Sequence, residues 1–212
     1  MKKIVLTASI LAAFISCKQA EDKARPDTPL QPVNTAETTT TAPDSATIQK
    51  AWIEYMTPGE IHKQLALDNG KWNESITIWE SPGAKPTTNK MTAESRMILG
   101  GRYQQMTHKG NFMGMDYEGI GTIGYDNASK KMVSTWVDNM GTGMMYMAAD
   151  YDGKSPTMEF KGEVTDPVTK KAKPSREIFT IVDDNTRQIE MFDVAPNGTE
   201  FKNMEITMTR AK

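Results

Sequence analysis

The sequence is short of the residues on which most catalytic and metal sites depend. Its 212 residues include one cysteine, which excludes an intrachain disulfide and a cysteine-based zinc site. Two histidines leave little material for a transition-metal centre or a catalytic triad. Neither sign of charge dominates, because 25 basic side chains stand against 27 acidic ones. A net charge of −2 argues against nucleic acid as a partner, since phosphate binding needs a basic excess.

The residues that are plentiful indicate a folded domain. Hydrophobic residues make up 38% of the chain, which is enough for a core and excludes disorder over the full length. The length suits one ordinary domain with extensions. Methionine and glycine are unusually frequent, with 16 and 15 residues.

Residues 1–16 have the pattern of an export signal. Two lysines precede an apolar run over residues 4–15, which is too short to span a bilayer comfortably. Ser16 then precedes Cys17, and a small residue before the only cysteine resembles a bacterial lipobox, with Phe14 in place of the usual leucine. The resemblance implies cleavage before Cys17 and its lipidation, which would anchor the protein because each buried methylene contributes about 0.8 kcal/mol. The alternative is an ordinary thiol beside a plain secretory cleavage site.

The lipobox resemblance also implies a place in the cell. A lipidated protein of this kind belongs to the bacterial cell envelope, anchored in a membrane and facing either the periplasm or the cell surface. Residues 17–44 follow the anchor and are rich in proline and threonine, with almost no large apolar side chains. Such a stretch predicts a disordered tether of extended geometry, at about 3.1 Å per residue. The folded domain is then expected over residues 45–212.

Two short helices are predicted at the start of this domain. The apolar spacing that begins at Ile48 indicates an amphipathic helix near residues 48–55. A second helix is predicted to begin with Thr57 as its N-cap and Glu60 three residues later, and to end at Gly70.

Beyond residue 70 the apolar pattern alternates with a period of two, which indicates strands. Most of the runs are separated by short turns rich in glycine, asparagine and aspartate. The candidate strands lie near residues 71–80, 90–99, 102–109, 114–126, 130–139, 144–151, 156–163, 175–183, 187–194 and 200–210.

Short turns between successive strands favour antiparallel neighbours in an up-and-down order. A sheet of about ten strands must close or stack to remove its exposed edges. The predicted fold is therefore all-β, an antiparallel up-and-down β-barrel of about ten strands with the helices over one mouth.

The run Gly70-Lys71-Trp72, at the entry to the first strand, resembles the Gly-x-Trp signature of calycins, the group that contains lipocalins and fatty-acid-binding proteins. In those barrels a basic residue of the last strand stacks on this tryptophan. The resemblance implies that Arg210 contacts Trp72 by a cation–π interaction and closes the barrel.

A closer resemblance covers residues 56–212. It is carried by the strings over residues 110–114, 117–127, 134–138 and 200–210, among them Tyr-Glu-Gly-Ile-Gly-Thr-Ile-Gly-Tyr-Asp-Asn and Ser-Thr-Trp-Val-Asp. In this order they resemble the bacterial DUF1579 family. That family is uncharacterised, so the resemblance implies no activity, substrate or cofactor.

The residues favour a protein that is not an enzyme. There is no Gly-x-Ser-x-Gly motif, and His62 and His108 lie on different elements, with His108 expected to be solvated in a turn. Glu118 and Glu190 could act as an acid–base pair, or could be exposed strand residues. The Met-x-Met pattern of residues 113–115 and the methionines at residues 144–147 suit Cu(I), but methionine also fills cores adaptably. We expect neither a metal nor a cofactor.

A barrel of this size predicts a small hydrophobic ligand inside it. Tyr117, Trp136 and Met144 are the candidate lining residues. Asp138 shares the face of Trp136, and Arg176 is its candidate partner, because a buried isolated charge is costly. The alternative is a filled barrel that acts as a structural or interaction module of the envelope.

Overall fold

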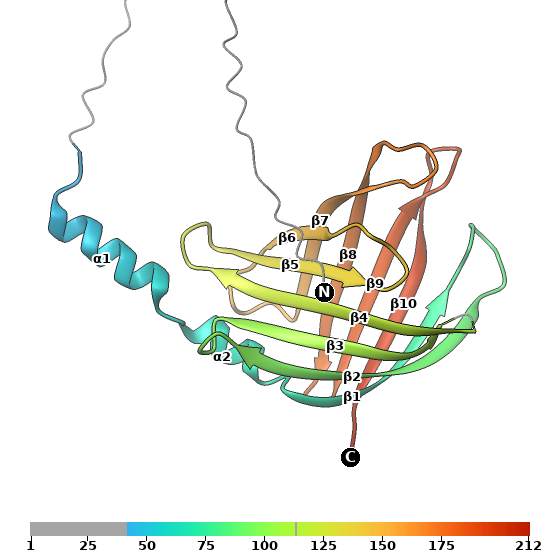
Figure 1. The fold of residues 1–212 in the computed structure, drawn as a ribbon, viewed down its shortest axis with the longest axis horizontal. Coiled ribbons are helices and arrows are strands. Elements are labelled where there is room, and N and C mark those ends of the chain that lie inside the picture. The colour runs from blue at the N-terminus through green and yellow to red at the C-terminus, as the bar shows by residue number, and fades with distance from the viewer. Residues whose placement is uncertain (1–41, 113) are drawn as a thin grey trace, which may run out of the picture. The chain divides into compact units, whose positions relative to one another are not determined.

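The computed structural model describes residues 42–112 and 114–212, which form two helices followed by ten strands (Figure 1). The predicted signal peptide, Cys17 and nearly all of the predicted tether lie outside the described residues. The helices are α1 (Ser45–Met56) and α2 (Glu60–Ala66). The strands are β1 (Gly70–Ile78), β2 (Thr87–Ile98), β3 (Tyr103–Phe112), β4 (Met115–Asp126), β5 (Lys131–Asp138), β6 (Met145–Asp150), β7 (Thr157–Thr165), β8 (Ala172–Asp183), β9 (Thr186–Val194) and β10 (Glu200–Arg210).

The ten strands form a closed barrel. Each strand is antiparallel to the next one in the sequence, and β10 pairs with β1 to close the ring. The closing register places Trp72 opposite Arg210 and Ile76 opposite Ile206. The predicted antiparallel up-and-down barrel is therefore confirmed, and closure removes the sheet edges as expected.

Alternation along the strands separates an inner from an outer face. On β1 the buried residues Trp72, Glu74 and Ile76 point inward, and their neighbours are more exposed. Two apolar clusters occupy the interior. One contains Trp72 with Ala93 and Met208, and the other is built from β5, β6 and β7. The second cluster consists of Met132, Met147, Ala149, Met158 and Phe160.

Helix α2 begins two residues later than the capping pattern predicted. Gly59 is its N-cap, and the backbone N–H of Gly59 donates to Nδ1 of His62 at 3.0 Å. Burial lowers the pKa of His62, which keeps Nδ1 available as an acceptor. Thr57 instead ends α1, where its hydroxyl donates to the carbonyl of Ile53. The predicted helix end at Gly70 is also wrong, because that residue begins β1 with a φ of 119°.

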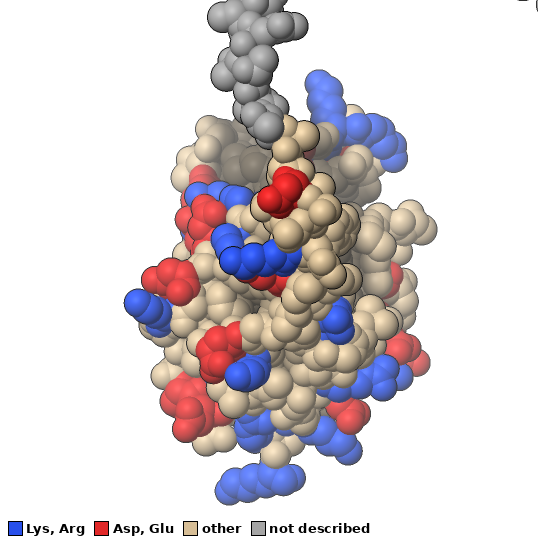
Figure 2. All heavy atoms as spheres, turned by 90° about the vertical axis from the view of Figure 1, so that its left-hand side faces the viewer, with Lys and Arg blue, Asp and Glu red and all other residues tan. Residues whose placement is uncertain are grey.

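Helix α1 is present as predicted, with Asp44 as its N-cap, but its apolar face is uncovered. Trp52 is 57% exposed. The helix is held at its C-terminal end, where Nδ2 of Asn127 and the guanidinium of Arg102 donate to carbonyls of the last turn. In the described part of the chain, neither helix has the length and apolarity needed to cross a bilayer. Figure 2 shows charges of both signs scattered over the face from which α1 projects, in keeping with the balanced composition.

Candidate functional site

A cavity of about 680 Å³ lies at the end of the barrel that α2 covers. Its walls come from α2, the β6–β7 loop, the β8–β9 turn and the inner faces of several strands. Most of the side chains that the inner faces of the strands present to the cavity are apolar, so the cavity suits an apolar molecule. The apolar lining residues are Ile61, Leu65, Leu67, Ile123, Met132, Pro156, Met158, Phe179 and Ile181.

Two hydrogen bonds of Gln64 join α2 to the β6–β7 loop at the wall of this cavity. The side-chain amide of Gln64 donates to the carbonyl of Gly153 at 3.1 Å. The hydroxyl of Tyr151 donates to Oε1 of the same glutamine at 3.2 Å. Burial raises the pKa of Tyr151, so its phenol stays a hydrogen-bond donor. Both hydrogen bonds must break if the β6–β7 loop is to move away from α2.

Trp72 is fully buried in the interior at this end of the barrel. The guanidinium carbon of Arg210 lies 4.4 Å from its ring centroid, where the calycin resemblance places a basic residue. Arg187 lies 5.4 Å from the same centroid and forms a buried ion pair with Asp68. Trp72 also donates from Nε1 to the carbonyl of Asp68 at 2.9 Å. These contacts attach the segment after α2 to β1 and β9, and Arg210 of β10 stacks on the same indole.

A second group of polar side chains lies further along the interior. Nδ1 of His108 on β3 lies 2.9 Å from Oε1 of Glu74 on β1, and both side chains are buried. The other carboxylate oxygen of Glu74 is buried with no hydrogen-bond partner in the described part of the chain. The imidazole of His108 also packs edge-on against Trp136, with 4.8 Å between ring centroids.

Asp138 organises the aromatic side of this group. Its Oδ2 accepts hydrogen bonds from Nε1 of Trp136 at 2.8 Å and from the hydroxyl of Tyr117 at 3.3 Å. Its Oδ1 accepts the backbone N–H groups of Met140 and Gly141. Burial raises the pKa of Tyr117, and the negative charge of Asp138 raises it further. The structure thus brings together three residues that the sequence singled out.

Two glycines of β4 make room for the indole of Trp136. A Cβ at Gly119 would lie 2.5 Å from Cζ2 of Trp136, and one at Gly121 would lie 3.4 Å from its Cε3. The indole therefore lies directly on the β4 backbone. Any larger residue at Gly119 would displace it.

Two of the predicted site residues do not join the group. Arg176 faces outward, where its guanidinium lies 3.7 Å from the ring centroid of Phe192 and forms ion pairs with Glu200 and Glu159. The predicted pairing of Arg176 with Asp138 is wrong, because the β8 register points Arg176 away from the interior. Met144 is 72% exposed in the loop before β6 and also lies apart from the group.

Two further expectations change with the structure. His108 is not solvated in a turn, because β3 continues to Phe112 and places this histidine inside the barrel. Glu118 and Glu190 are not an acid–base pair. They form separate ion pairs with Lys109 and Lys202, so they are the exposed or partly exposed strand residues of the alternative.

Glu177 is an inner-face carboxyl group that the sequence reading missed. It lies opposite Phe160 on β7 and Met191 on β9. Desolvation by these neighbours raises its pKa to about 7, although the side chain keeps partial exposure. The alternation that places Phe179 and Ile181 on the inner face also places Glu177 there. On β1, the shared face of Trp72 and Ile76 likewise includes Glu74.

No three histidine, cysteine or acidic side chains converge into a possible metal site within residues 42–112 and 114–212.

Comparisons with known proteins identify a family and a fold. Residues 57–210 match the family described as "Protein of unknown function (DUF1579)". No curated protein matches the chain. Among solved structures, the chain is similar to Rv2717c from M. tuberculosis, with 10% identity and a TM-score of 0.56 over 74% of this chain and 100% of that one. A redesigned β-barrel is 11% identical, with a TM-score of 0.40 over 70% of this chain and 95% of that one.

Proposed function

The chain belongs to the DUF1579 family of proteins of unknown function, and we propose that it is a non-catalytic binding protein of the bacterial envelope. In this proposal Cys17 carries the lipid anchor. The barrel binds a small apolar molecule in the cavity beneath α2.

The apolar cavity at the α2 end carries this proposal. Its volume of about 680 Å³ falls within the usual range for small-molecule sites, about 300–1,000 Å³. Its apolar walls favour a hydrophobic occupant. Several of its polar side chains already have partners, as Gln64 has in Tyr151 and Arg187 in Asp68. An apolar molecule can therefore fill the space without leaving these groups unpaired.

Filling the cavity tests the proposal. The test uses the full-length chain with Cys17→Ala, which removes the lipidated cysteine, and Nile red as a neutral fluorescent probe. Ile181→Trp adds volume inside the cavity, whereas Val182→Trp adds the same side chain to the exposed face of the same strand. We expect Nile red to bind the parent and the Val182 variant but not the Ile181 variant.

Two results would contradict cavity binding. One is the absence of saturable Nile red binding to the parent, which would favour a structural or interaction module. The other is equal binding by both tryptophan variants, with circular dichroism showing that both are folded.

The anchor has its own test. In a bacterial host, the wild-type chain should incorporate labelled palmitate, and Cys17→Ala should not. Ser16→Ala is the matched control, because it keeps a small residue before the cysteine. Equal incorporation of palmitate by the wild-type and Cys17→Ala chains, or none by the wild-type chain, would refute lipidation at Cys17.

A further inference from the structure

The inner face of the barrel carries an uneven distribution of charge. At the α2 end, Arg187 is paired with Asp68, and Arg210 donates to carbonyls of the segment before β1. At the opposite rim, Lys173 is paired with Asp193. Between these two ends the inward-facing acidic residues in the described chain are Glu74, Asp138 and Glu177, and the one basic side chain among the described inner-face residues there is the imidazole of His108, which contacts Glu74.

These three carboxyl groups lack full compensation by protein cations. Asp138 accepts hydrogen bonds only from neutral donors. Glu74 contacts His108 through one oxygen, and its other oxygen is buried without a partner among the described residues. For Glu177, the described part of the chain supplies no hydrogen bond or ion pair. The middle of the barrel therefore favours a positively charged guest over an anion.

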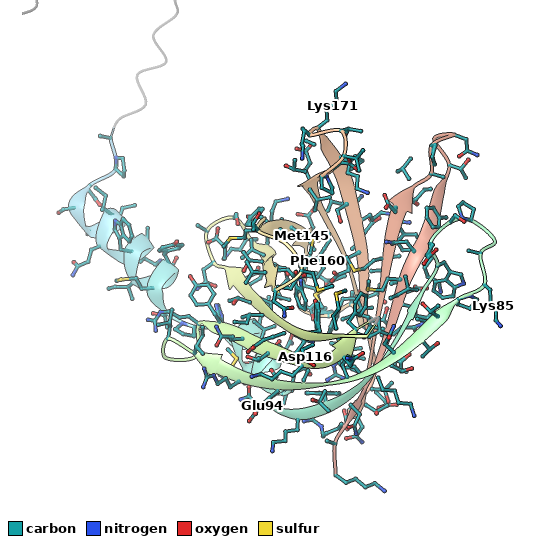
Figure 3. The ribbon with its side chains drawn as sticks, turned by 45° about the vertical axis from the view of Figure 1, so that its right-hand side comes forward. Lys85, Glu94, Asp116, Met145, Phe160 and Lys171 are labelled. Atoms are coloured by element: carbon teal, nitrogen blue, oxygen red, sulfur yellow. The ribbon has the colours of Figure 1, made fainter. Side chains whose placement is uncertain are left out.

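An apolar strip connects the two acidic regions. Trp136 lies opposite Met145 in the β5–β6 register. Met145 packs against the apolar cluster that contains Phe160, and Figure 3 shows both side chains in the same part of the interior. Phe160 lies opposite Glu177 in the β7–β8 register. The wall from Asp138 to Glu177 is thus acidic at its ends and apolar between them.

This part of the barrel is open to solvent. Several inward-facing residues around Glu177 keep partial exposure, although Phe160 is buried. Met145, Glu177 and Met191 are partly exposed, whereas Met132, Met147 and Met158 are buried. A molecule can therefore approach Glu177 through the open end.

We propose that the open half of the barrel binds an organic cation, an alkylammonium compound with an apolar body. Its ammonium group pairs with Glu177, and its body lies along Phe160 and Met145 towards Trp136. An aromatic face such as that of Trp136 attracts cations as well as apolar groups. Glu177, Phe160 and Met145 do not line the cavity beneath α2, so the two sites have different walls.

Charge pairing at Glu177 makes binding depend on pH. Its pKa of about 7 reflects the cost of ionising a carboxyl group among apolar neighbours, and a bound cation offsets that cost. The inner face of β7 carries no titratable side chain. That of β9 carries Arg187 and Asp193, both already paired, and β8 itself adds Lys173. Glu177 is therefore the group near this position whose titration changes the binding of a cation.

The experiment compares three octyl compounds by isothermal titration calorimetry with the full-length Cys17→Ala chain. Octyltrimethylammonium is a permanent cation, octanol is neutral and octanoate is an anion. At about pH 8 we expect the cation to bind about tenfold more tightly than octanol, with octanoate weakest. At about pH 5.5 the advantage of the cation should fall by about tenfold, because Glu177 is then protonated.

Two variants locate the effect. Glu177→Gln keeps the shape and removes the charge, so both the cation preference and its pH dependence should disappear. Glu163→Gln removes an exposed carboxylate from the outer face of β7 and should change neither. If the glutamine variant does not fold, the pH dependence of the parent still decides the question.

Three results would overturn the proposal. They are equal affinity for cation and octanol at about pH 8, an unchanged preference in Glu177→Gln, and loss of cation binding in Ile181→Trp with retention in Glu177→Gln. The last would place the cation beneath α2. Failure of Nile red to bind leaves this test intact, because the two sites are probed by different ligands and variants.

Discussion

The guanidinium of Arg210, at the end of the last strand, stacks on the indole of Trp72, near the start of the first strand. The two residues are also register partners, so the contact joins the strands that close the barrel. Arg210 donates in addition to the carbonyls of Leu67 and Asn69. One side chain thereby links β10, β1 and the segment that follows α2.

Loss of this stacked pair should destabilise the fold. Trp72→Ala removes a fully buried side chain and should lower the free energy of unfolding by about 3–5 kcal/mol. Trp52→Ala, at a site 57% exposed on α1, is the control and should cost about 0.5 kcal/mol or less. Urea denaturation followed by circular dichroism measures both. Equal costs for the two tryptophans would contradict a structural role for the pair.

A methyl group at Gly119 should strain the Trp136 site. Because the new Cβ would lie 2.5 Å from the indole, Gly119→Ala should cost about 1–3 kcal/mol of stability. Gly141→Ala, where a Cβ meets nothing within 4 Å, is the matched control. Adding Trp136→Phe should recover part of the loss, which a double-mutant cycle in urea would measure. A Gly119 variant as stable as the control would rule out the close contact.

The carboxylate of Asp138 should influence the ionisation of Tyr117. The substitution Asp138→Asn removes a negative charge that disfavours the tyrosinate, so it should lower the pKa of Tyr117 towards its ordinary value. Ultraviolet difference absorbance during an alkaline titration follows this change, with Tyr117→Phe identifying the signal. Asp116→Asn, on the exposed outer face of β4, should leave the titration unchanged. An identical titration in both aspartate variants would argue against the Asp138–Tyr117 contact.

Glu177 should make the barrel less stable at alkaline pH. Its pKa is raised from 4.5 to about 7, so the folded state holds this proton more tightly than the unfolded state. The stabilising contribution is complete below about pH 4.5 and is lost as the pH rises through 7. Glu177→Gln should therefore match the parent at about pH 4 and exceed it by about 3 kcal/mol at about pH 8. Parallel stability curves for the two chains would exclude the shifted ionisation.

Prediction from the sequence succeeded for elements whose signals are local. The ten strands and their turns lie close to their predicted positions, because alternation and turn residues act over a few neighbours. At His108 a local signal misled, since Lys109 and Gly110 resemble a turn. A Cβ at Gly110 would lie 2.7 Å from Cγ of Met91, so this glycine serves close packing within the strand.

On β8 both faces are partly apolar, so the alternation of apolar residues does not predict whether Arg176 points into or out of the barrel. Phe179 and Ile181 point inward, but Ile178 and Val182 on the other face are equally apolar. Tertiary pairing resolves the ambiguity. Outer-face Glu200 lies within hydrogen-bonding reach of Arg176, and Glu177 is left inside.

From the order of its residues alone, this protein was assigned an all-β barrel with Trp72 and Arg210 at its closure. Alternation, turn chemistry and a family resemblance were sufficient for that. Only the folded ring decided which distant side chains meet, such as Glu74 and His108, which are 34 residues apart and lie on strands separated by β2. The physical reason is that strand period sets the face of a residue, whereas the curvature and stagger of a closed sheet set its neighbours across that face.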